Sequence, residues 1–191
     1  VSCQSSTAHD PLCERPELDG KPNIITVAWA GTICSDPAMV SISVRKERYS
    51  HDIIKETGEF VINLVNKRLV RATDYCGVKS GRDVDKFAET RLTPQASRYV
   101  KAPGIEESPV NIECKVTEVK ELGSHDMFLA KVVGVTIDNQ YMDDRGKFNL
   151  NASGLTAYSH GEYFELGKKL GSFGYSVRKP AKKKKRGGNK K

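Results

Sequence analysis

The pattern of apolar and polar positions predicts a chain built mainly from β-strands. Residues 24–33 and 38–45 are rich in β-branched side chains and are separated by Ser-Asp-Pro, a turn sequence. Residues 59–64 form another short apolar run directly after a glycine. Residues 110–117 alternate strictly between apolar and polar side chains, which predicts a half-buried strand, and residues 127–137 are almost continuously apolar.

Only short helices are predicted between these strands. One begins at Ser50, a suitable N-cap residue, and ends before Gly58, a common stop signal. Residues 67–75 and 83–90 are predicted to form two more, on either side of a Gly-rich loop. The helices therefore lie between strands without setting up a βαβ alternation.

Two features of the second half complete the predicted topology. The alternation slips near Glu118, where a β-bulge accounts for the change of phase. Residues 171–177 are predicted to be a last short strand. Many strands, few helices and no βαβ alternation favour a barrel over a doubly wound sheet.

The opening strand has an unusual composition. The segment NIITVAWAGTICSDP, from Asn23 to Pro37, is rich in small side chains and contains Trp29, the chain's only tryptophan. Small side chains allow a flat ligand to lie against the backbone, whose polar groups can then bond the edge of a ring. Close packing of the strand against a helix explains the same composition, and the pattern leaves both interpretations open.

Charge divides the chain into a body and a basic end. The formal charge is +7, but residues 178–191 carry nine Lys or Arg and no acid, so the rest has 22 basic and 24 acidic residues. A slightly acidic body argues against a nucleic-acid-binding fold. We predict an irregular leader over 1–19, one domain over 20–177 and a disordered basic tail over 178–191.

The cysteines predict a reducing compartment. Their number is odd and no C-x-x-C or other metal-ligand spacing occurs. Cys34 and Cys114 fit small buried apolar residues, whereas Cys3 and Cys13 could pair only in an oxidising compartment. The absence of an apolar stretch of roughly 20 residues argues against a membrane span. We expect a cytoplasmic protein without a metal site.

Common catalytic signatures are missing from the sequence. It contains no dinucleotide-binding or P-loop glycine motif, no G-x-S-x-G and no H-E-x-x-H. No protein-borne catalytic nucleophile is therefore predicted. Any redox chemistry would be carried by a bound cofactor.

Two segments have the composition of an anion site. Arg45, Lys46 and Arg48 precede the Ser50 helix start, where charges, a hydroxyl and free N–H groups would suit a phosphate. The loop from residue 75 to 87 supplies two glycines, a serine and three bases, which suits a backbone anion nest. On the residues alone, a solvated basic face and an ordinary loop capped by Asp83 explain these two segments better than an anion site does.

Six segments together carry a resemblance to a known family. In chain order they are NIITVAWAGTICSDPAMVSISVR, RYSHDIIKETGEFVINL, DYCGVKSGRDVDKF, SPVNIECKV, GSHDMFLAKV and AYSHGEYFELGKKLGSFGYSV. Their order and spacing over residues 20–177 resemble the flavin reductase-like, FMN-binding split-barrel family, and the flavoredoxin branch most closely. The resemblance implies a mainly β fold with short helices, a six-stranded split β-barrel that forms homodimers with FMN at the interface.

The same resemblance implies which residues approach the flavin. Asn23 and Trp29 would lie near the ring, and the backbone around Ala28 and Ala30 would line its polar edge. Arg48 and Ser50 would bind the phosphate or ribityl chain. The other flavin-site residues that it implies are Ser80, Lys86, His125 and Tyr158. Apart from the resemblance, a surface lysine and a turn histidine explain Lys86 and His125.

One part of the chain departs from the family pattern. Related chains have an apolar strand before the Asp19-Gly20 turn, whereas residues 1–18 are polar and irregular here. The first barrel strand is therefore expected to be missing or altered. Such a change would affect FMN binding and dimer packing.

The resemblance implies an FMN flavoprotein oxidoreductase, either a flavin reductase or a flavoredoxin-like electron carrier. Electrons would come from NAD(P)H or a redox partner protein and pass through FMN, to free flavin or another acceptor, so no residue is predicted to be catalytic in itself. The alternative is a non-catalytic module that binds flavin, or nucleic acid through its basic tail.

Overall fold

The chain folds around one antiparallel sheet. The structure, a computed structural model, describes residues 2–4 and 20–178, with only the backbone described for 2–4. The seven strands of the main sheet lie in the order β2-β1-β5-β8-β9-β4-β3. They are β1 (Ser2–Gln4), β2 (Pro22–Ile24), β3 (Ala30–Ser35), β4 (Ala38–Arg45), β5 (Glu59–Asn63), β8 (Val110–Glu121) and β9 (His125–Ile137). The predicted class, mainly β with short helices, is confirmed.

The sheet curls because its two edges are consecutive in the chain. β2 and β3 are opposite edge strands, and only residues 25–29 join them. Six gaps between neighbouring strands span about 29 Å in a flat sheet, whereas six extended residues reach only about 20–22 Å. The edges must therefore approach each other without pairing, which makes the sheet an open, split barrel.

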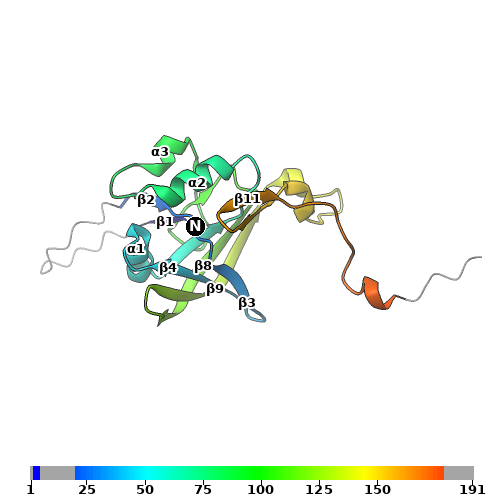
Figure 1. Cartoon of the computed structure of the whole chain (residues 1–191), viewed down its shortest axis with the longest axis horizontal. Helices are drawn as coiled ribbons and strands as arrows, with labels where there is room; N and C mark the ends of the chain where they lie inside the picture. The colour runs from blue at the N-terminus through cyan, green and yellow to red at the C-terminus, as the bar shows by residue number, and fades with distance from the viewer. Residues whose placement is uncertain (1, 5–19, 179–191) are drawn as a thin grey trace, which may run out of the picture.

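The helices lie outside the sheet (Figure 1). They are α1 (Tyr49–Thr57), α2 (Val70–Val78) and α3 (Lys86–Thr90), with 3-10 turns at Asn139–Tyr141, Leu150–Ser153 and Tyr175–Val177. Two small sheets pair β6 (Pro94–Gln95) with β7 (Gly104–Ile105), and β10 (Thr156–Ser159) with β11 (Glu162–Glu165). Among the described residues, no helix is long and apolar enough to cross a membrane.

The main core lies between the curled sheet and α1. Ile53 and Ile54 of α1 are completely buried against Ile42, Phe60 and Phe128 of the sheet. Each such side chain stabilises the fold by about 1.5–3 kcal/mol through its burial. The adjacent isoleucines predicted as an apolar helix face therefore fix the position of α1.

The strands at the start of the chain differ from the sequence prediction in two ways. The run 24–33 is divided into β2 and β3, because the chain leaves one sheet edge and enters the other between them. A short upstream strand, β1, does exist at Ser2–Gln4 and pairs with both β2 and β5. The predicted leader and tail otherwise fall on residues 5–19 and 179–191, which lie outside the described residues.

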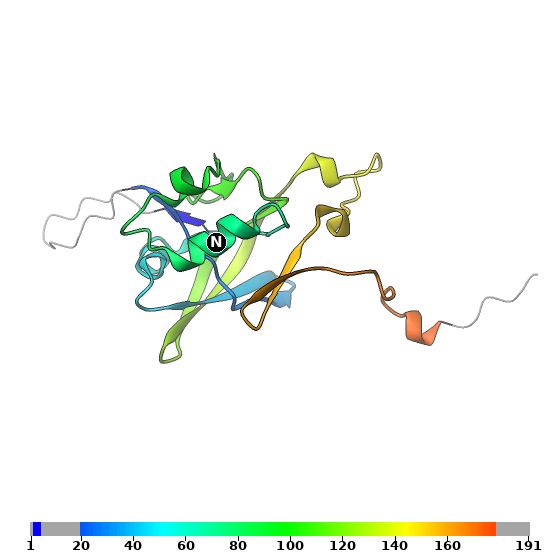
Figure 2. The same cartoon turned by 45° about the horizontal axis from the view of Figure 1, so that its top comes forward.

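Of three local predictions, for a bulge, a helix cap and a last strand, the structure confirms the first and corrects the other two. The predicted bulge is confirmed, because the β8–β9 register shifts between Val116 and Glu118. The N-cap of α1 is Arg48 and not Ser50, whose hydroxyl is used elsewhere. Residues 171–177 form no strand; they belong to an arm, residues 166–177, that leaves the body after β11 (Figures 1 and 2).

Candidate functional site

A cavity of about 540 Å³ lies where the opening segment meets α2 and the β10–β11 hairpin. Its walls come from residues 24–28 and Ala30, from the end of β5 and the chain after it, from α2 and from the hairpin. The small side chains of the opening segment leave this space beside the backbone. The interpretation of that composition as room for a flat ligand is therefore consistent with the geometry.

Polar groups gather where α2 faces the hairpin. The Thr26 hydroxyl donates to the carbonyl of Thr73. Tyr163 Oη donates to Asp74 Oδ1 at 3.2 Å, and the Tyr158 ring packs on Tyr163 with centroids 5.2 Å apart. All five residues line a mostly apolar cavity. A few placed polar groups in an apolar cavity are typical of sites that orient a small molecule.

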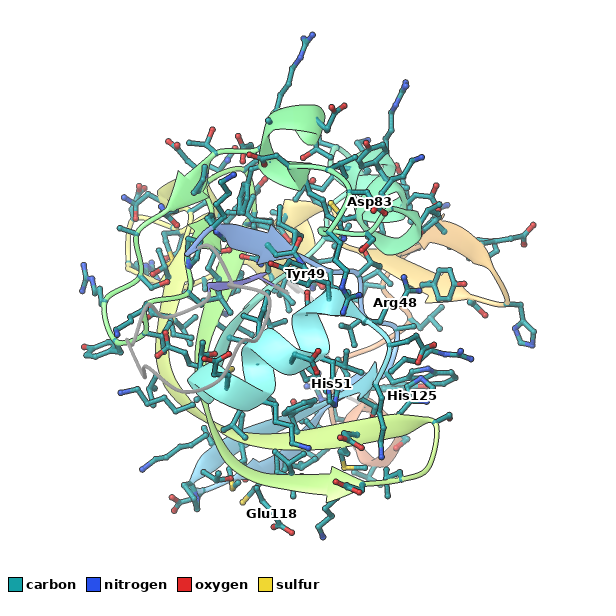
Figure 3. The ribbon with its side chains drawn as sticks, turned by 90° about the vertical axis from the view of Figure 1, so that its left-hand side faces the viewer. Arg48, Tyr49, His51, Asp83, Glu118 and His125 are labelled. Atoms are coloured by element: carbon teal, nitrogen blue, oxygen red, sulfur yellow. The ribbon has the colours of Figure 1, made fainter. Side chains whose placement is uncertain are left out.

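Basic side chains lie just outside the cavity near Gly77, at what we call its basic end, although none of them lines it. Arg48 donates from Nη1 to the carbonyl of Gly77 at 3.1 Å, and Gly77 lines the cavity. Arg82 lies over the ring of Tyr49 at 5.2 Å and donates to the carbonyl of Glu47. Figure 3 shows Arg48 and Tyr49 together at the start of α1. This end would attract an anion, and no side chain caps the start of α1.

Asn23 and Ser50 form a buried polar contact. Asn23 Nδ2 donates to Ser50 Oγ at 2.8 Å, and both residues are buried. A Cβ at Gly81 would lie only 2.6 Å from Asn23 Cγ, so the loop before α3 closes tightly over this pair. The contact therefore joins the opening segment, α1 and the loop that follows α2.

Lys86 is buried and not at the surface. Its Nζ donates to the carbonyls of Ile24 at 2.7 Å and Cys76 at 2.8 Å. Both of these residues line the cavity, while the ammonium bonds their backbone. The surface-lysine interpretation is therefore wrong for this position.

The remaining predicted residues lie around the site. Ser80 Oγ accepts from the backbone N–H of Arg82 at 3.2 Å. His125 is paired with Ser124 at the tip of the β8–β9 hairpin, on the other side of Arg48 from Asp83 (Figure 3). Trp29 is 67% exposed and does not line the cavity, although its carbonyl accepts from the N–H of Ser43.

The ten predicted residues thus fall into three groups. Ala28, Ala30 and Tyr158 line the cavity. Those buried behind its wall or placed beside its basic end are Asn23, Ser50, Lys86, Arg48 and Ser80. Trp29 and His125 do not line the cavity of this chain, so within one chain neither residue is placed to contact a ligand there.

Sequence reasoning missed the polar residues opposite the opening segment, above all Asp74 and Tyr163. A signal for Tyr163 was present. The His160-Gly161 pair has φ angles of 50° and 85°, as a tight two-residue hairpin turn requires. Such a turn places Tyr158 opposite Tyr163 in the hairpin. Nothing local in the sequence indicates that Asp74 meets this hairpin.

A charge cluster around two buried residues, His51 and Asp126, was also not predicted and ties α1 to β9. His51 contacts Asp126 Oδ2 through Nε2 and Asp52 Oδ1 through Nδ1, each at 2.9 Å, and Lys46 lies 3.4 Å from Asp126 Oδ1. Burial raises the pKa of Asp126, but the hydrogen bond from His51 and the contact with Lys46 outweigh burial and hold that pKa below its usual range. The cluster fixes the start of α1 beside the basic end.

Comparisons with known proteins agree with this geometry. Residues 7–167 match the family model described as flavin reductase like domain. The flavoredoxin of Desulfovibrio vulgaris (Miyazaki F) is 30% identical, and the match covers 93% of this chain and 90% of that one with a TM-score of 0.80. The flavoredoxin from Methanosarcina acetivorans is 27% identical, with coverages of 84% and 87% and a TM-score of 0.75. An uncharacterized protein of Archaeoglobus fulgidus is 32% identical over 144 residues, 75% of this chain and 80% of the relative.

Proposed function

Because the chain belongs to the flavin reductase-like domain family, we propose that it binds FMN in the cavity beside its opening segment and acts as a flavin-dependent oxidoreductase. The observation that carries the proposal is a mostly apolar cavity of about 540 Å³ with Arg48 just outside it, bonded to the carbonyl of Gly77 in its wall. That volume falls within the about 300–1,000 Å³ of small-molecule sites.

The charges suggest how FMN would be oriented. Its phosphate would lie toward Arg48 and the start of α1, where the guanidinium and the helix dipole favour an anion. The flat ring would then lie between the opening segment near Ala28 and the Tyr158 side of the hairpin.

Bound FMN would supply the redox chemistry by accepting and passing on electrons. The chain's own residues would bind and orient it. Asn23 and Ser50 would keep the opening segment next to α1. Thr26 and Tyr163 would hold α2 and the hairpin in place and so limit access of water.

The proposal has two forms, which differ in the electron donor. A flavin reductase would take hydride from NADH or NADPH, whereas a flavoredoxin-like carrier would take electrons from a redox protein. The two flavoredoxins among the similar structures favour the carrier. Mixing the holoprotein with NADH and NADPH and following absorbance at about 450 nm tests this, because only a reductase loses its oxidised-flavin colour.

The first experiment is the absorption spectrum of the purified protein, followed by titration of the apoprotein with FMN. We expect a yellow protein or uptake of one FMN per chain. Arg48→Ala should weaken FMN binding about tenfold by removing a charge-assisted phosphate contact, with Arg91→Ala, at the far end of α3, as the control. A colourless protein that takes up no FMN would reject the proposal and favour a non-catalytic module with a nucleic-acid-binding tail.

We further propose that the chain forms a homodimer through the arm of residues 166–177. Leu170 is 94% and Phe173 is 105% exposed, and the arm extends away from the body (Figure 2). Two exchanged arms would remove on the order of 1,000 Å² or more from water, close to what a specific interface needs. A second copy would also cover exposed Trp29 and Ile33.

A cytoplasmic location belongs to the same proposal. Cys34, Cys76 and Cys114 are free thiols in the part of the chain that the structure describes. Free thiols are typical of a reducing compartment.

A further inference from the structure

The outer side of α2 carries positive charge that the proposed FMN site does not use. Arg71 is exposed on the helix, and exposed Arg68 and Lys79 lie just before and just after it. In the part of the chain that the structure describes, no carboxylate forms an ion pair with these three side chains. Val78 follows Arg71 at a spacing of seven residues, on the same side of the helix, and is 72% exposed. We call Arg68, Arg71, Val78 and Lys79 the α2 face.

Charge is distributed unevenly over the body of the chain. Residues 67–82 carry five basic side chains and one acidic side chain, a net charge of +4. Residues 1–177 as a whole carry 22 basic and 24 acidic side chains, a net charge of −2, so the remainder of this body carries −6. Such a separation turns an approaching acidic protein so that α2 meets it first, and it raises the rate of association.

The α2 face lies directly outside the cavity. Val78 both lines the cavity and reaches solvent, and α2 also supplies Ala72, Thr73, Asp74, Cys76 and Gly77 to the cavity wall. An α-helix with its side chains is about 10–12 Å across. A redox group held against the α2 face is therefore separated from the cavity by about one helix diameter, a distance that electrons cross between proteins.

The combination of an exposed apolar residue with basic neighbours fits a protein partner better than a nucleic acid. Protein interfaces combine an apolar centre with a polar rim, and Val78 with the three bases has this arrangement. The phosphates of a nucleic acid would contact the bases but would leave Val78 without an apolar partner. The charges therefore fit a protein with an acidic surface.

We propose that the α2 face is the docking surface for an acidic one-electron carrier protein, which delivers electrons across α2 to the cavity. This inference rests on the proposed function in its carrier form. Each encounter oxidises the partner by one electron, and two encounters, with protons taken from water, complete the reduction of one FMN. The interface is small and weak, as is typical of electron-transfer complexes.

The first test follows electron transfer from a chemically reduced plant-type ferredoxin, an acidic iron–sulfur protein, to the FMN-loaded full chain by stopped-flow absorbance. Arg68→Glu with Arg71→Glu reverses two charges of the α2 face, and neither residue lines the cavity. Lys115→Glu with Lys131→Glu is the matched control, because these exposed lysines pair across β8 and β9 and the net charge changes by the same amount. The basic residues 178–191 are present in all three chains and cannot explain a difference between them.

We expect the α2 double variant to accept electrons about tenfold more slowly than the wild type at low ionic strength, because steering toward α2 is lost. The control should change the rate less than about twofold, and all three rates should converge at high salt, where charges are screened. Equal slowing in both double variants would show an effect of net charge alone and would overturn the docking surface, as would an unchanged rate in the α2 variant.

Two further measurements separate the partner class from the proposed function. Tighter binding of a labelled DNA duplex than of ferredoxin, lost in the α2 variant, would assign the face to nucleic acid and overturn the inference. If the wild type binds no FMN, the proposed function fails, and the anisotropy of fluorescently labelled ferredoxin mixed with the FMN-free chain still decides the docking. Binding that weakens in the α2 variant and persists in the control would support the surface, and equal binding to both would reject it.

Discussion

Among single residues, Asn23, Ser50 and Gly81 pack so closely that no larger side chain fits at Gly81 without movement. Asn23 is held by its hydrogen bond to Ser50, and the chain at Gly81 passes directly over the Asn23 amide. The amide cannot turn away without breaking the contact with Ser50. Gly81 is therefore required for close approach and not for an unusual backbone angle.

Gly81→Ala is expected to destabilise the fold by about 1–3 kcal/mol, because the new methyl group overlaps the Asn23 amide and the loop before α3 must move. Urea denaturation measures the change. Gly167→Ala is the matched control, since a Cβ there meets nothing within 4 Å. Equal free energies of unfolding for the two variants would contradict the prediction and show that the loop before α3 can move aside at no cost.

The His51 cluster makes a pH-dependent contribution at the same scale. The pKa of Asp126 in the fold lies below its ordinary 3.8, because the contacts with His51 and Lys46 outweigh burial. A carboxylate with a lowered pKa stabilises the fold above its unfolded pKa, and this contribution is lost as the pH falls through the folded pKa.

Asp126→Asn should therefore cost about 1.5–3 kcal/mol at pH 7, and the cost should shrink as the pH falls below about 4. Denaturation curves between neutral and acid pH test both points. Asp52→Asn removes the exposed carboxylate of the same cluster and should cost much less. A cost for Asp126→Asn that does not change with pH would contradict the assignment.

At the scale of elements, the β10–β11 hairpin forms one wall of the cavity while remaining separate from the main sheet. The chain enters it through the Thr156 N–H, which donates to the carbonyl of Val65, and Tyr163 pins it to α2 through Asp74. Few contacts hold it, so it is expected to open more easily than the core.

Tyr163→Phe removes the bond to Asp74 and should speed hydrogen exchange in Thr156–Ser159 several-fold, because an exposed hydrogen bond contributes only about 0.5–1.5 kcal/mol. FMN affinity should fall by a similar factor. Hydrogen exchange with mass spectrometry provides the measurement, and Tyr175→Phe on the arm is the control. An unchanged exchange rate would mean that Asp74 does not secure the hairpin.

At the scale of the whole molecule, the open barrel leaves surfaces that one chain does not cover. β3 is an edge strand with most of its residues exposed, and the arm carries exposed apolar side chains from Leu166 to Val177. Uncovered apolar segments and an exposed sheet edge favour association. The proposed homodimer would bury both.

Truncation after Gly167 should convert the dimer to a monomer at micromolar concentration, because it removes four exposed apolar residues of the arm, Leu170, Phe173, Tyr175 and Val177. Truncation after Val177 removes only the basic end and should leave the dimer intact. Sedimentation velocity distinguishes the two states. A dimer that survives truncation after Gly167 would assign the interface to another surface.

The local pattern by itself determined most of the elements. Alternation predicted β8 and its bulge, adjacent isoleucines predicted the buried face of α1, and glycine marked its end. These signals are local because each depends on residues within one or two turns of chain. The ordered motifs also carried the family, which the match over residues 7–167 confirms.

The use of the candidate residues follows from contacts between distant parts of the chain. The opening run has the same strand composition throughout, yet it divides between two sheet edges because residues 25–29 bridge the split in the barrel. Lys86 and Ser50 have polar side chains that suit a surface or a ligand, and their buried partners lie 62 and 27 residues away. Contacts over such separations depend on how the whole sheet curls, and no local pattern contains that information.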